Sequence, residues 1–272
     1  MDFALSSAHE VLRKTVHEFA EREIRPKSLE YDASQEYPMD WARKMAGLGL
    51  LGIYVPEKYG GSGLDSISYA IAIEELSWGD ASAGVIAAVN NGLVCEPVLT
   101  YGSEAQKTAF LPKLAAGEWM GAYCLTEPGS GSDAAAMRTT AKLQGDEWVL
   151  NGTKIFVTNA LHANLLVVYA RTGETKHDIS AFLVPKPSKG LSELKKEDKM
   201  GIRASDTMML GFEDVRIPKE NLLGTRGKGF NIALATLDGG RIGIAAQALG
   251  IAQAAYDEAA KYAKAREAFG KP

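Results

Sequence analysis

The sequence contains few of the residues that build disulfide frameworks or metal sites. Only two cysteines, Cys95 and Cys124, and four histidines occur among its 272 residues. The cysteines lie too far apart for a disulfide framework, and no histidine stands at ligand spacing from a cysteine or another histidine. We therefore expect a reducing compartment and no metal site.

Excess positive charge and long apolar runs are also lacking. The formal net charge is −4, whereas nucleic-acid binding requires clustered cationic charge. No apolar run approaches the roughly 18 residues that cross a bilayer, and the N-terminus, MDFALSSAHE, lacks the features of a signal peptide. We expect no nucleic-acid or membrane partner, and a cytoplasmic location, or the mitochondrial matrix for a mature eukaryotic form.

The residues that are present change in character twice. Residues 1–120 show helical spacing of apolar residues. Residues 121–228 hold short β-rich runs without helices between them, and Asn151-Gly152 between two such runs predicts a tight hairpin. Residues 229–272 are helical again. We expect an α+β protein with an N-terminal α-helical domain, a middle antiparallel β-barrel or sandwich domain, and the beginning of a C-terminal helical domain.

Glycines interrupt the last helical run, at Gly239, Gly240, Gly243 and Gly250. Each costs about 1 kcal/mol relative to alanine. A helix tolerates this cost where something approaches its backbone closely. We expect contact there with another helix, a second subunit or a ligand.

Two segments of the β-rich region have residues suited to ligand binding. The stretch YCLTEPGSGSD at 123–133 offers backbone N–H groups and small hydroxyls to a polar ring or a phosphate, although a surface turn has the same composition. Phe156 and Thr158 stand two apart on a predicted strand. They suit a planar heteroaromatic ligand, or else form a core aromatic beside a strand-end threonine.

A third segment, LDGGR, lies in the last helical run. Asp238 and Arg241 are three residues apart and share a helix face. Either they pair with each other, or they flank a polar ligand held against the two glycines between them.

In this order and spacing, these segments resemble the acyl-CoA dehydrogenase family. TEPGSGSD matches that family's flavin loop. Further family motifs follow across the chain: NGTK at 151–154, KMGIRASDT at 199–207, FEDVRIP at 212–218, GKGF at 227–230 and REAFGK at 266–271. The resemblance implies a short-chain, butyryl-CoA type member that lacks most of the C-terminal four-helix domain, which builds a homotetramer in the family.

The resemblance also assigns residues to sites. Those implied to bind FAD are Tyr123, Leu125, Thr126, Gly131, Ser132, Phe156, Val157, Thr158, Arg266 and Phe269. Arg266 would reach the FAD of a neighbouring subunit. Those implied to bind the acyl-CoA are Ser132, Asp238, Gly239, Gly240 and Arg241.

The implied activity is α,β-dehydrogenation of a short-chain acyl-CoA to the trans-2-enoyl-CoA in fatty acid β-oxidation. A glutamate removes the α-proton, hydride passes to flavin N5, and electrons leave to an electron-transferring flavoprotein. A branched-chain or glutaryl substrate is the competing interpretation.

The family's catalytic glutamate has no counterpart in this sequence. In the isovaleryl branch the base stands at the position of Gly240, and in the others it lies near the C-terminus, in a segment outside these residues. We therefore expect no catalytic base within residues 1–272, and an inactive chain. The alternative is a short protein of the same fold that binds flavin or acyl-CoA, or serves in assembly, without dehydrogenation.

Overall fold

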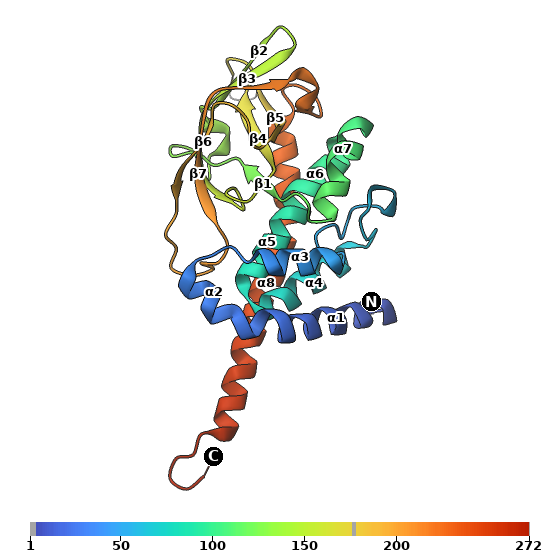
Figure 1. The fold of residues 1–272 in the computed structure, drawn as a ribbon, viewed down its shortest axis with the longest axis vertical. Coiled ribbons are helices and arrows are strands. Elements are labelled where there is room, and N and C mark those ends of the chain that lie inside the picture. The colour runs from blue at the N-terminus through green and yellow to red at the C-terminus, as the bar shows by residue number, and fades with distance from the viewer. Residues whose placement is uncertain (1–3, 176–177, 272) are drawn as a thin grey trace.

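A helical domain opens the computed structural model, which describes residues 4–175 and 178–271 (Figure 1). Side-chain oxygens cap its helices: Ser6 accepts from the backbone N–H of His9, and Asp65 from that of Ser68. The helices are α1 (Ser7–Phe19), α2 (Ser28–Ser34), α3 (Met39–Gly47), α4 (Ser66–Gly79), α5 (Ala81–Ala88), α6 (Glu96–Tyr101) and α7 (Glu104–Ala115).

One continuous helical stretch runs through the centre of this domain. A π-helical segment, η4 (Val89–Cys95), joins α5 to α6. By length and composition the whole stretch, residues 81–101, could cross a membrane, but 72% of its most apolar window is buried in the protein. It is thus a core helix of this fold. The expectation that no apolar segment reaches this length was wrong, because the polar residues within the stretch hide its length.

Two buried asparagines in η4 tie the helical domain together. Asn90 donates to the carbonyl oxygen of Leu51 at 2.8 Å and accepts from the backbone N–H of Gly121 at 2.9 Å. Asn91 donates to Leu50 O at 2.8 Å. Both side chains are fully buried, so these bonds replace lost hydration and fix the start of the first strand against η4.

A mixed sheet follows the helical domain. Its strands are β1 (Gly121–Cys124), β2 (Thr140–Gln144), β3 (Glu147–Thr158), β4 (Leu165–Arg171), β5 (Ile179–Pro185), β6 (Leu191–Lys196), β7 (Thr207–Pro218) and β8 (Leu222–Leu223). They are ordered β6-β7-β3-β2-β4-β5-β8, with β1 parallel to β4. The expected fold class is confirmed. Most pairs are antiparallel, and β2 adds a short parallel contact with β4.

The predicted hairpin at Asn151-Gly152 was wrong. Both residues lie inside β3, where the register with β7 shifts between Leu150 and Gly152. Gly152 has φ +149°, and a Cβ there would stand 2.4 Å from Thr139 Oγ1. The dipeptide therefore forms a bulge, which also uses a positive φ. The hairpin turn falls instead at Gly145-Asp146, between β2 and β3.

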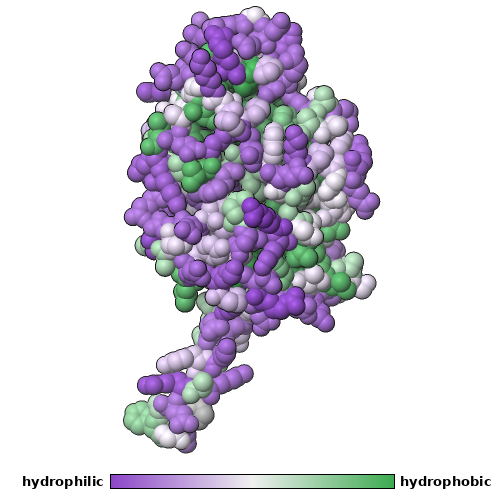
Figure 2. All heavy atoms as spheres, viewed as in Figure 1, coloured by the Kyte–Doolittle hydropathy of each residue, from purple (hydrophilic) through white to green (hydrophobic). Residues whose placement is uncertain are grey.

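The last helix, α8 (Gly229–Ala265), spans both parts of the protein. It begins beside β5, passes α5 and α4, and its last turns stand clear of the body (Figures 1 and 2). Gly229 and Gly250 are buried at its two crossings, where added Cβ atoms would meet the backbones of Ser180 and Glu74. The expected close approach of another helix is thus found at Gly250.

Candidate functional site

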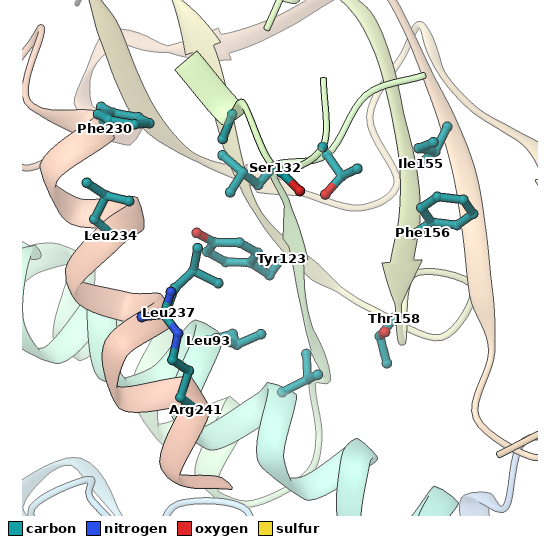
Figure 3. A pocket seen from close by; sticks show the side chains of 15 residues that line it. Leu93, Tyr123, Ser132, Ile155, Phe156, Thr158, Phe230, Leu234, Leu237 and Arg241 are labelled. Carbon is teal, nitrogen blue, oxygen red and sulfur yellow. The ribbon is translucent and has the colours of Figure 1, made fainter. Parts of the chain in front are cut away.

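A cavity of about 490 Å³ lies between the sheet and the first turns of α8 (Figure 3). Its volume falls within the range of small-molecule sites. One wall is the end of β1 with the loop after it, another is the end of β3, and the others are η4 and α8. The lining residues are Val89, Leu93, Tyr123, Leu125, Thr126, Gly131, Ser132, Ala134, Ile155, Phe156, Thr158, Phe230, Leu234, Leu237 and Arg241.

The loop after β1 is an anchored structure and not a free surface turn. Glu127 and Ser130 exchange backbone hydrogen bonds, N–H to O, at 2.9 and 3.1 Å. Glu127 itself is buried, 6% exposed. At Gly129 and Gly131, by contrast, an added Cβ would meet no atom of the described chain within 4 Å. The loop therefore combines a fixed base with an accessible backbone.

A bulge in β3 turns Phe156 toward the cavity. The register of β3 with β7 shifts between Lys154 and Val157, and Phe156 has φ +56°. Phe156 is consequently 61% exposed, whereas the side chain of Val157 is fully buried in the core. Phe156 and Thr158 both line the cavity, although the bulge and not regular strand alternation brings them together, and Val157 could meet a ligand there only through its backbone.

Tyr123 forms the floor of the cavity near α8. Its ring centroid lies 5.1 Å from that of Tyr169, and its hydroxyl donates to Ala233 O at 3.4 Å. Burial raises the pKa of Tyr123, so the phenol stays neutral and offers a ring rather than a charge.

On α8, the LDGGR segment fits both interpretations in part: its charged residues pair with each other, and one of them also lines the cavity. Arg241 forms an ion pair with Asp238, so the pairing interpretation holds in this structure. Arg241 also lines the cavity, whereas Asp238 and Gly239 do not. Gly240 lies on an adjoining apolar cavity of about 210 Å³, beside Leu93 and Ile244.

Neither cavity is lined by an acidic side chain from the described residues. One carboxylate of the loop, that of Glu127, is held by Lys154 and by backbone N–H groups. It is therefore committed to structure.

Two predicted cofactor residues lie elsewhere. Arg266 and Phe269 follow the end of α8, and both are exposed, far from the cavity along the helix (Figure 1). Within this chain they do not join the site. Their assignment to a neighbouring subunit's cofactor stays a prediction.

Sequence reasoning missed the apolar residues of the α8 wall. Phe230, Leu234 and Leu237 face Tyr123 and Ser132 across the cavity (Figure 3). Their spacing is helical, but periodicity does not distinguish a face that covers a core from one that covers a ligand. Leu234 is 45% exposed, so its face of the helix does not cover a packed core.

Comparisons with known proteins agree along the whole chain. Three domains of one family match: "Acyl-CoA dehydrogenase, N-terminal domain" over residues 6–118, "Acyl-CoA dehydrogenase, middle domain" over 122–215 and "Acyl-CoA dehydrogenase, C-terminal domain" over 227–272. The mitochondrial short-chain specific acyl-CoA dehydrogenase of Rattus norvegicus is 53% identical over 270 residues, which cover 98% of this chain and 66% of that protein.

Solved structures are equally similar. Butyryl-CoA dehydrogenase from Megasphaera elsdenii superposes with a TM-score of 0.97 at 45% identity, covering 100% of this chain and 73% of that one. An acyl-CoA dehydrogenase complexed with FAD from Bacillus anthracis gives a TM-score of 0.92 at 39% identity, covering 98% and 46%. The chain thus spans about two thirds of the length of the rat relative.

Proposed function

The chain belongs to the acyl-CoA dehydrogenase family, and we propose that it provides the flavin and thioester sites of a short-chain acyl-CoA dehydrogenase. The observation that carries this proposal is the cavity between the TEPGSGSD loop, the bulged end of β3 and α8. It is supported by the short-chain specificity of the rat relative and the butyryl-CoA specificity of the Megasphaera enzyme.

FAD is the cofactor that we assign to the cavity. The lining fits a flat, polar heteroaromatic ring, because it combines the rings of Tyr123 and Phe156 with the hydroxyls of Thr126, Ser132 and Thr158. The Bacillus anthracis relative is complexed with FAD. When bound, the flavin supplies the acceptor for the substrate's β-hydride.

The residues of this chain bind and orient the reactants. The hydroxyl of Thr158 and the open backbone at Gly131 offer polar contacts to the ring, while Phe230, Leu234 and Leu237 exclude water from the α8 side. We assign the acyl group to the adjoining apolar cavity beside Gly240. Arg241 stands between the two cavities, where its charge suits an anionic part of the CoA.

We propose that the base removing the α-proton lies outside residues 1–272. The support is the absence of a carboxylate among the described residues that line either cavity. The electron acceptor is then an electron-transferring flavoprotein, and a homotetramer is the assembly that would bring Arg266 to a partner's cofactor. We propose the bacterial cytoplasm or the mitochondrial matrix as the location.

A second function follows from the same observation. A protein that holds flavin or acyl-CoA without a base would serve in binding or in assembly rather than in dehydrogenation. A single spectroscopic measurement distinguishes the two functions.

The visible spectrum of the chain with FAD, before and after anaerobic butyryl-CoA, tests both. We expect the chain to bind flavin that stays oxidised, and a C-terminally extended protein to bleach. Bleaching by residues 1–272 alone would contradict the placement of the base. No bleaching by the extended protein would favour the binding function, and Gly240→Glu tests whether a carboxylate on α8 supplies the missing base.

A further inference from the structure

A buried ion pair lies directly behind the cavity. The ammonium of Lys154 stands 2.9 Å from Oε1 of Glu127, and the two side chains are 0% and 6% exposed. Unpaired charges at such depth are strongly disfavoured. A pair retained at this depth therefore calls for an explanation in terms of the residues it holds.

The pair fastens both ends of the cavity loop, residues 125–139. Lys154 Nζ also donates to Leu125 O at 2.8 Å, at the start of the loop. The Glu127 carboxylate accepts from the backbone N–H groups of Arg138 and Thr139 at 2.6 and 2.9 Å, at its end. One salt bridge thus closes a loop that contains five cavity-lining residues, Leu125, Thr126, Gly131, Ser132 and Ala134.

The pair is also joined to the opposite wall. The backbone N–H of Ile155 donates to Thr126 O at 2.9 Å, and Ile155 and Phe156, which follow Lys154 on β3, line the cavity. The ammonium is therefore one hydrogen bond from a lining residue, Leu125, on the loop side. On the strand side, Lys154 directly precedes the lining residues Ile155 and Phe156.

The balance of charge in the pair matters because both side chains are buried. Burial lowers the pKa of Lys154, and Glu127 opposes that shift. For Glu127, burial pushes the pKa upward, but Lys154 and the Thr139 and Arg138 donors outweigh it and lower the pKa. Each charge is thus stabilised by the other, and removing one leaves an uncompensated charge beside the cavity.

We propose that Lys154 and Glu127 are a positioning pair that holds the loop at 125–139 in its ligand-binding form and sets the electrostatic potential on the cofactor in the cavity. This role rests on the proposed function for its second part, the effect on the cofactor. Its first part concerns the protein without ligand and is tested separately.

Hydrogen exchange in the ligand-free chain tests the loop. Lys154→Met releases the carboxylate and should speed exchange of the Arg138 and Thr139 amides at least tenfold. Glu127→Gln keeps only one of the two acceptor oxygens, so it should speed exchange of at least one of these amides by the same factor. The control is Glu147→Gln, at the other end of β3, where an exposed pair with Arg216 is removed. Unchanged exchange in both variants would overturn the clamp, whether or not the protein binds flavin.

The midpoint potential of bound FAD tests the electrostatic part, since reduction adds negative charge to the ring. Glu127→Gln, measured at pH 6, leaves a cation and should raise the potential relative to wild type. Lys154→Met, measured at pH 8, leaves an anion and should lower it. We expect a tenfold change in the reduction equilibrium, about 30 mV for two electrons, in opposite directions.

The double variant Lys154→Met/Glu127→Gln separates charge from packing. It removes both charges, so its potential should return to the wild-type value while its loop amides stay fast-exchanging. Equal shifts of the same sign in both single variants would show mere loosening and overturn the electrostatic role. A wild-type protein that binds no flavin would refute the proposed function and leave the exchange result to decide the clamp.

Discussion

Gly250 of α8 lies against the backbone of Glu74 in α4: a Cβ built on Gly250 would stand 2.1 Å from the Glu74 carbonyl oxygen. The sequence predicted that glycines in this helix mark a close approach, and here the approaching element is a helix of the N-terminal domain. Gly243 is similar, since its Cβ would meet the hydroxyl of Tyr69 at 2.2 Å.

Gly250→Ala should therefore destabilise the protein, by about 2 kcal/mol or more, because the two helix backbones must move apart. The measurement is urea unfolding followed by circular dichroism. Gly239→Ala is the matched control: a Cβ there meets no described atom within 4 Å, so alanine should stabilise α8 by up to about 1 kcal/mol. A loss of stability in both variants would contradict the contact as its cause.

Asn90→Ala should cost about 2–4 kcal/mol, because it leaves Gly121 N–H and Leu51 O unpaired in the core. Thermal or urea unfolding measures the loss. Asn151 also makes two side-chain bonds, with Asp214, but both residues are exposed. Asn151→Ala should cost well under half as much, and equal costs would show that burial does not decide the effect.

The stability gained by Glu96→Gln should depend on pH. Burial raises the pKa of Glu96 above 4.5, although Thr100 donates to it and opposes the shift. Oε2 is buried without a hydrogen-bond partner among the described residues. A raised folded-state pKa means that the folded protein binds the proton more tightly, so wild-type stability falls as pH rises from 4.5 through the raised value.

Glutamine carries no charge and should escape that loss. We expect Glu96→Gln to be more stable than wild type by about 1 kcal/mol at pH 8 and equal to it near pH 4. Unfolding curves at both pH values check this. A gain of the same size at both would assign the effect to packing and not to ionisation.

Gly152→Ala should destabilise β3 by about 2 kcal/mol or more, since its Cβ would also stand 2.7 Å from Thr139 Cα. Gly145 offers a comparison within the same hairpin. It has φ +65° with no described atom within 4 Å of an added Cβ, so Gly145→Ala should cost only about 1 kcal/mol of backbone strain. Urea unfolding of the two variants in parallel separates steric contact from strain.

The sequence identified the cavity loop because its chemistry is local: small residues expose backbone. It also selected Phe156 and Thr158, but by strand alternation, whereas the structure brings Phe156 to the cavity through a bulge at positive φ. It failed at Asn151-Gly152, since an Asn-Gly pair satisfies a bulge as well as a turn. The sequence also did not predict the parallel pairing of β1 with β4. Strand β1 is short, and its start is held by a buried bond from Gly121 N–H to Asn90, which no local pattern records.

The α8 wall of the cavity illustrates the remaining limit. Leu234 and Leu237 have the spacing of a core-facing stripe, and whether such a stripe faces protein or an open space depends on residues far away in sequence. Gly240 stood out in the sequence because it occupies the position at which the isovaleryl branch has its catalytic glutamate. Its place beside the apolar cavity depends on Leu93, which η4 brings to it.

The crossing of α8 over α4 has a consequence for how the protein is made. During synthesis α4 emerges from the ribosome long before Gly250, so the side of α4 that α8 covers stays open while the sheet is still being produced. Contacts so distant in sequence form late and slow folding. A nascent chain paused within the sheet should therefore leave that side of α4 uncovered, and chaperone binding should end only when α8 has left the exit tunnel.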